Sequence, residues 1–195
     1  MGIHKLADVH PKAQLPKGTF VGAFTQVYEN VAFGAEANIG SHCLIGLPDA
    51  TGKYGELSIG DCATIRSHSV FYEGSSIGQG LTTGHHVSVR ENLVAGNDLL
   101  LGSYSDVQGH AKFGESVKIY NGAHIARHTV LGNYVWIFPF VVFTNDPTPP
   151  SDGFETGATV EDFAVLATRT TVMPGINIGV DSFVGAGSLL TKDVA

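Results

Sequence analysis

The chain of 195 residues is long enough for one domain with a continuous core, and it contains 25 glycines, 43% hydrophobic residues and only 15% charged residues. Low charge combined with many glycines is typical of a mostly-β protein with tight turns. The formal net charge of −7, with no run of Lys or Arg residues, argues against a nucleic-acid-binding surface.

The N-terminal segment, residues 1–20, precedes the regular part of the sequence. It contains no apolar stretch as long as a signal peptide or a transmembrane helix, which favours a cytoplasmic protein without a membrane partner. Cys43 and Cys62 are too few for a disulfide framework and fit a reducing compartment. Because the end of a repetitive β-structure needs covering, we expect residues 1–20, with Pro11 and Pro16, to form an N-terminal cap.

A large apolar residue recurs at every sixth position in three blocks within residues 21–195, and only Thr83 and Ala95 break the pattern. The next position is often Gly, and the fourth position after the apolar residue is often small, which would permit tight bends. A period of six fits neither an α-helix nor a simple alternating strand. It predicts an all-β solenoid, a parallel β-helix in which each hexad is a short strand plus a corner and three hexads close a coil of 18 residues. The predicted inward residues are Val21, Val27, Phe33, Ile39 and Ile45; every sixth residue from Ile59 to Phe143; and Val160, Leu166, Val172, Ile178, Val184 and Leu190.

Two interruptions separate these blocks. Turn-forming residues lie between Ile45 and Ile59, and several prolines and glycines between Phe143 and Val160 forbid a continuous strand. We therefore expect two loop excursions, near residues 47–57 and 145–158. Loops that leave a rigid scaffold often carry function.

From Val21 to Val194 the sequence resembles the left-handed β-helix of hexapeptide acyltransferases. The most specific match is the C-terminal run that ends at Val194, TVMPGINIGVDSFVGAGSLLTKDV. Within that family, TGHHVSVREN and FPFVVFTNDPTPPS are similar to segments of enzymes that N-acetylate nucleotide-linked aminosugars. The resemblance implies acetyl-CoA as donor, a small-molecule amine as acceptor and a homotrimer with its sites at the subunit seams. It also implies that acyl-CoA lies along the last coils, where it would contact Ala167, Gly185, Ala186 and Lys192. No metal is implied.

Residues 18 apart should stack about one strand spacing (~4.8 Å) from each other. Asp146 then stacks on His128, His128 on His110, and His110 on Asn92. The neighbouring column contains Asn145, Arg127, Gly109, Glu91 and Glu73. Two columns of polar side chains that lead to the second excursion are what a functional site needs. A stack of solvent-exposed polar side chains along a corner, without any function, would show the same pattern. We predict catalytic roles for His128 and Asp146, and acceptor binding by Arg90, Glu91, His110, Arg127 and Asn145.

His85 belongs to a different corner, which it shares with Ser103 and Asn121. Its neighbour His86 should stack on His68 and Tyr104. If the chain forms the trimer that the resemblance implies, His85 could approach the His128 column of the next subunit. His85 is therefore the third candidate catalytic residue.

The expected chemistry is direct transfer, because no motif demands a covalent acyl-enzyme. An amine attacks the thioester, a base accepts its proton, and an N–H donor stabilises the oxyanion. A histidine oriented by a carboxylate suits the base. Which of His85, His128 and Asp146 serves as the base stays open.

Three alternatives follow from the same fold. A γ-class carbonic-anhydrase-like enzyme would need three histidines around Zn²⁺; His124 and His128 could form the close pair, but no histidine occurs at positions 88–92. A non-catalytic scaffold would not require the second excursion. An acyl carrier protein as donor would favour a basic docking patch, and none is evident.

Overall fold

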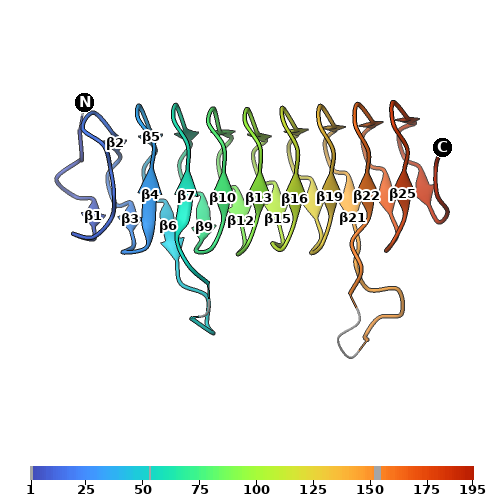
Figure 1. The fold of residues 1–195 in the computed structure, drawn as a ribbon, viewed down its shortest axis with the longest axis horizontal. Helices are drawn as coiled ribbons and strands as arrows, with labels where there is room; N and C mark the ends of the chain where they lie inside the picture. The colour runs from blue at the N-terminus through green and yellow to red at the C-terminus, as the bar shows by residue number, and fades with distance from the viewer. Residues whose placement is uncertain (1, 53, 152–154) are drawn as a thin grey trace.

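The computed structural model describes residues 2–52, 54–151 and 155–195, which form one elongated solenoid (Figure 1). Lys53 and residues 152–154, which belong to the two predicted excursions, lie outside the described residues. In the described part of the chain there is no helix long and apolar enough to cross a membrane.

The described strands form three parallel sheets, called here sheets I, II and III. Sheet I contains, in spatial order, β1 (Asp8–Val9), β3 (Gln26–Val27), β6 (Leu44–Leu47), β9 (Val70–Tyr72), β12 (Ser88–Val89), β15 (Asp106–Val107), β18 (His124–Ile125), β21 (Val142–Phe143), β24 (Thr171–Val172) and β27 (Leu189–Leu190). Sheet II contains β4 (Val31–Phe33), β7 (Leu57–Ile59), β10 (Ser76–Ile77), β13 (Val94–Ala95), β16 (Lys112–Phe113), β19 (Val130–Leu131), β22 (Thr159–Val160) and β25 (Asn177–Ile178). Sheet III contains β2 (Phe20–Val21), β5 (Asn38–Ile39), β8 (Thr64–Ile65), β11 (Thr82–Thr83), β14 (Leu100–Leu101), β17 (Lys118–Ile119), β20 (Trp136–Ile137), β23 (Val165–Leu166) and β26 (Phe183–Val184).

Successive coils pair in the register that the six-residue period predicts. In sheet I, Val89 pairs with Val107 and Val107 pairs with Ile125. The predicted inward residues form the buried core, except Leu190 in the last coil, which is half-buried against it. Even Thr83 is only 1% exposed, and its buried hydroxyl is satisfied because it donates to the Gly84 carbonyl and accepts from the Arg66 amide, both at 2.9 Å. The predicted parallel β-helix is confirmed.

The corners obtain their bend from a residue three positions after the inward one. At this position His86, His110 and His128 have φ of 58°, 48° and 63°, a left-handed conformation that L-residues rarely adopt. The glycine that often follows the inward residue has a different role from the one we expected. A Cβ added at Gly60 would lie 2.6 Å from the backbone nitrogen of Gln79, so this glycine lets neighbouring coils approach rather than permitting the bend.

Residues 2–20 cap the core as a further coil in the same register. Ile3 bridges Val21, and β1 pairs with β3, one coil further along the chain. Ile3, Val9 and Leu15 continue the six-residue step back from Val21. The cap is therefore continuous with the β-helix, without a structural break at residue 20.

Both excursions leave the solenoid at one corner, between sheet I and sheet II. The first lies between β6 and β7, and the second between β21 and β22. Ile45 pairs with Phe71 and Phe143 with Val172, so each excursion lengthens its coil while the strands on either side still pair inward residue to inward residue. They project from the same side of the solenoid (Figure 1).

We predict that Gly60→Ala destabilises the protein by about 1–3 kcal/mol, because the new methyl group would overlap the backbone of the next coil. Gly55→Ala is the matched control, since a Cβ there meets no atom within 4 Å. Urea unfolding followed by circular dichroism measures both variants. Equal unfolding midpoints for the two variants would contradict this role of Gly60.

Candidate functional site

The corner that carries both excursions also carries the two predicted polar columns. The rings of His110 and His128 lie 5.6 Å apart between centroids, which confirms the predicted stacking of these residues. Gly109 lies directly against the backbone of Glu91, as the neighbouring column requires. We call this region the excursion corner.

A buried carboxylate stands at the centre of the excursion corner. Glu91 is only 2% exposed and accepts a hydrogen bond from Arg90 Nε at 2.8 Å. The other oxygen of its carboxylate lies 3.7 Å from Arg127 Nη2 and 3.9 Å from His110 Nε2. Burial lowers the pKa of Arg90, but the hydrogen bond and the charge of Glu91 outweigh it, so the pKa is raised overall. The guanidinium groups of Arg90 and Arg127 explain how a carboxylate is accommodated away from water.

The first excursion is attached to this cluster by two side chains. Asp49 lies 3.6 Å from Arg90 Nη2, and Tyr54 Oη lies 3.4 Å from His110 Nε2. Arg90 also lies over the ring of Tyr72, with its guanidinium carbon 4.7 Å from the ring centroid. Burial, followed by the charge of Arg127, lowers the pKa of His110.

The second excursion is attached through Glu155. Its carboxylate lies 3.6 Å from Arg127 Nε and 3.9 Å from His128 Nε2. Arg127 Nε is buried but makes no hydrogen bond with the described residues, because 3.6 Å is too long for one. Glu91 and Arg127 therefore link the two excursions through one charged network.

Asp146 has its carboxylate oriented within the second excursion rather than toward His128. One oxygen accepts from the Thr148 amide at 2.9 Å and from the Ser151 hydroxyl at 2.8 Å, and the other accepts from the Ser151 amide at 3.0 Å. The Ser151 hydroxyl and these amides lower the pKa of Asp146, which keeps it ionised. Next to it, the Asn145 carbonyl accepts from the Thr156 amide and closes the base of the excursion.

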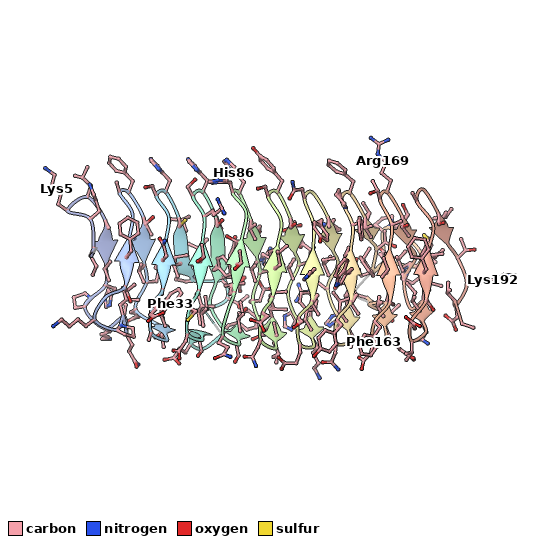
Figure 2. The ribbon with its side chains drawn as sticks, turned by 90° about the horizontal axis from the view of Figure 1, so that it is seen from above. Lys5, Phe33, His86, Phe163, Arg169 and Lys192 are labelled. Atoms are coloured by element: carbon pink, nitrogen blue, oxygen red, sulfur yellow. The ribbon has the colours of Figure 1, made fainter. Side chains whose placement is uncertain are left out.

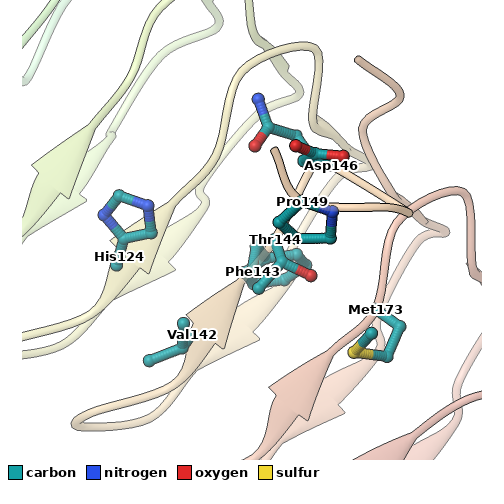
Figure 3. A pocket seen from close by; sticks show the side chains of 8 residues that line it. His124, Val142, Phe143, Thr144, Asp146, Pro149 and Met173 are labelled. Atoms are coloured by element: carbon teal, nitrogen blue, oxygen red, sulfur yellow. The ribbon is translucent and has the colours of Figure 1, made fainter. Parts of the chain in front are cut away.

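A cavity of 370 Å³ lies at this base, on the outer face of sheet I (Figure 3). It contains both apolar and polar walls, as small-molecule sites usually do. The lining residues are His124, Val142, Phe143, Thr144, Asn145, Asp146, Pro149 and Met173.

The histidine in this cavity was not among the predicted catalytic residues. His124 Nδ1 lies 3.0 Å from Asp106 Oδ2, in the strand one coil earlier. Asp106 also accepts a hydrogen bond of 2.5 Å from the side chain of Gln108. The sequence contained a signal for this pair, because Asp106 and His124 are separated by one full coil and occupy outward positions of neighbouring strands. A histidine held by a carboxylate can accept a proton in catalysis.

His85 lies at the corner between sheets III and I, away from the excursion corner. Its Nδ1 is 2.8 Å from Ser67 Oγ, and its amide donates to Ser103 Oγ at 3.0 Å. The neighbouring His86 stacks on His68 and Tyr104 at 4.7 and 4.9 Å between centroids, which confirms the predicted stack. His86 projects from the edge of the solenoid (Figure 2). Within one chain, no contact joins His85 to the other candidate residues in the described part of the structure.

No family model matches the chain. The bifunctional protein GlmU of Exiguobacterium sibiricum is 26% identical over 174 residues, which cover 89% of this chain and 36% of that protein. The acyl-[acyl-carrier-protein]–UDP-N-acetylglucosamine O-acyltransferase of Thermodesulfovibrio yellowstonii is 27% identical over 156 residues, which cover 69% and 56% of the two chains. The solved UDP-N-acetylglucosamine acyltransferase from Campylobacter jejuni superposes with a TM-score of 0.72 at 16% identity, over 89% of this chain and 68% of that one.

The chain is a left-handed β-helix related to acyltransferases. The resemblance seen in the sequence is thereby confirmed. The chain spans 36% and 56% of the lengths of the two curated relatives.

The residues predicted to contact the donor lie in the last coils of the left-handed β-helix. Ala167 follows β23 and Gly185 follows β26, one coil apart, and the Ala167 amide donates to the Val184 carbonyl at 2.9 Å. Gly185 and Ala186 are exposed, so their backbone is accessible. Lys192 is exposed at the C-terminal end (Figure 2).

His124 and His128, the close histidine pair of the zinc alternative, do not share an ion-pair partner among the described residues. His124 contacts Asp106, whereas His128 lies near Glu155. Across the described residues, no three His, Cys, Asp or Glu side chains converge in a group that could hold a metal ion.

We predict that Glu91→Gln destabilises the protein by about 1–3 kcal/mol, because Arg90 and Arg127 lose their shared buried counter-charge. Glu56→Gln makes the same charge change at an exposed position of the first excursion and is expected to be neutral. Urea unfolding of both variants at pH 7 measures the difference. An unchanged midpoint for Glu91→Gln would show that the network does not stabilise the fold.

Proposed function

We propose that this protein is a CoA-dependent N-acetyltransferase, which moves an acetyl group from acetyl-CoA to the amino group of a nucleotide-linked aminosugar by direct transfer. One observation carries the proposal. A cavity with a carboxylate-bound histidine lies at the base of the second excursion, on a fold whose curated relative acts on UDP-N-acetylglucosamine.

The excursion corner supports binding of the nucleotide-linked acceptor. Arg90 and Arg127 are each one-third exposed, so their guanidinium groups can reach a diphosphate while Glu91 fixes their position. His110 and Asn145 lie at the same corner and supply further polar contacts. An amine acceptor is favoured by the likeness of TGHHVSVREN and FPFVVFTNDPTPPS to sugar N-acetyltransferases.

For the donor, acetyl-CoA would lie along the last coils, against Ala167 and the exposed backbone of Gly185 and Ala186, with Lys192 meeting a phosphate. A cytoplasmic homotrimer would place His85 of one subunit near the His128 column of the next. His128 and Asp146 remain candidates for contacting the reacting groups.

The name of one relative favours a different acyl donor, an acyl carrier protein. The Thermodesulfovibrio yellowstonii enzyme is named for an acyl group on acyl carrier protein and for O-acylation. Transfer of an acyl group from a carrier protein to a sugar hydroxyl is therefore the competing reaction on the same site.

The test is a thiol-release assay with the purified full chain. Acetyl-CoA and acetyl-acyl carrier protein are compared as donors, and nucleotide-linked aminosugars are compared with the corresponding hydroxyl sugars as acceptors. We expect thiol release that depends on both acetyl-CoA and an aminosugar, with a product heavier by one acetyl group. Release only with the carrier protein would favour the competing reaction, and no release with any pair would overturn acyl transfer.

A further inference from the structure

The imidazole of His124 is held in one orientation by a network on the outer face of sheet I. Asp106 accepts from His124 Nδ1 at 3.0 Å and from Gln108 Nε2 at 2.5 Å. Burial raises the pKa of Asp106, but the hydrogen bonds from His124 and Gln108 and the charge of His124 lower it overall. Asp106 is thus an ionised acceptor near neutral pH. Because a carboxylate only accepts, the proton of the neutral imidazole stays on Nδ1 and leaves a lone pair on Nε2.

His124 Nε2 is therefore the ring nitrogen that is available to a molecule in the cavity. Among the residues described by the structure, it has no hydrogen-bond partner, and His124 forms one wall of the cavity (Figure 3). The titratable groups facing the imidazole are Asp106, from the neighbouring strand, and Asp146, on the far side of the cavity. Asp146 is itself engaged by the Thr148 amide and by the amide and hydroxyl of Ser151, so it stabilises the cavity wall.

The other candidate histidines have less suitable surroundings within one chain. His128 is about as exposed as His124, at 46% against 40%, but its closest carboxylate, that of Glu155, is 3.9 Å away. His110 Nε2 already contacts Glu91 and Tyr54. His85 Nδ1 is bound to a hydroxyl group. In the described part of the chain, His124 alone combines a carboxylate at hydrogen-bond distance with a cavity.

We propose that His124 is the residue that accepts the proton during acyl transfer, and that Asp106 is its positioning residue. This inference rests on the proposed function and names the group that performs its proton transfer. It differs from the sequence-based prediction, which left the base open among His85, His128 and Asp146.

The step balances without a further reactant. The acceptor nitrogen attacks the carbonyl carbon of the thioester, and the proton that it loses passes to His124 Nε2. The tetrahedral intermediate then collapses, the carbon–sulfur bond breaks, and the electron pair leaves with sulfur. The imidazolium returns its proton to this thiolate, so that the amide, free CoA thiol and neutral imidazole are the products.

The experiment compares His124→Ala with wild-type protein, using the donor and acceptor that give the fastest thiol release. We expect kcat to fall by about 10²–10⁴-fold, the usual contribution of a positioned base, with the KM values changed by less than about threefold. Imidazole added to His124→Ala should restore part of kcat, because the cavity can admit it. Asp106→Ala should lower kcat by a smaller factor, also without a large change in KM.

The matched control is His10→Ala, in the first coil, which should keep the wild-type kcat. Circular dichroism and thermal unfolding establish that each variant is folded.

If the wild-type protein releases thiol but His124→Ala retains more than about one tenth of kcat, or imidazole gives no rescue of an inactive folded variant, the inference is wrong while the proposed function stands. If His128→Ala or His85→Ala shows the larger loss and the imidazole rescue instead, that histidine is the base. If the wild-type protein releases no thiol with any donor and acceptor, the proposed function fails and the inference with it.

Discussion

The one-coil register of the coil-to-coil hydrogen bonds is the constraint on which the rest of the structure depends. Each strand of two to four residues is too short to be stable alone, so its backbone groups must pair with the coils on either side. A shift of one residue would turn the inward position outward. Outward residues are therefore fixed in columns as strictly as the core is. His124 meets Asp106 because they occupy one such column.

The same register determines what the excursions can do. The second excursion leaves and rejoins the scaffold without a register shift, since Phe143 still pairs with Val172, whereas the first begins at a local shift between Ile45 and Leu47. Glu91, Arg90 and Arg127 then bind both excursions to rigid strands through opposite charges. These ion pairs hold the described parts of both excursions against the strands beside the cavity. This arrangement is what a site for a charged, nucleotide-linked acceptor needs.

The sequence predicted those features that follow from periodicity alone. The inward residues, the three-hexad coil, the two excursions and the stack of His110 on His128 all follow from counting in sixes. Counting also applied to Ile3 and Val9, but the next positions, His4 and His10, lack the Gly of the pattern. Asp146 could not be placed in this way, because its partners Thr148 and Ser151 belong to the excursion, where the register no longer holds. His124 was not predicted as the base because it lies on a strand face and not in the two corner columns, although counting by 18 residues places it beside Asp106.

We propose that acyl transfer takes place in the cavity at the base of the second excursion. A crystal structure of the protein with CoA and the aminosugar acceptor bound tests it most directly. We expect the acceptor amine within about 3.2 Å of His124 Nε2, the usual reach of a general base, with the CoA sulfur nearby. An acceptor amine and CoA sulfur that meet away from this cavity, beside His85 or along the exposed ring stack of His86, would contradict it.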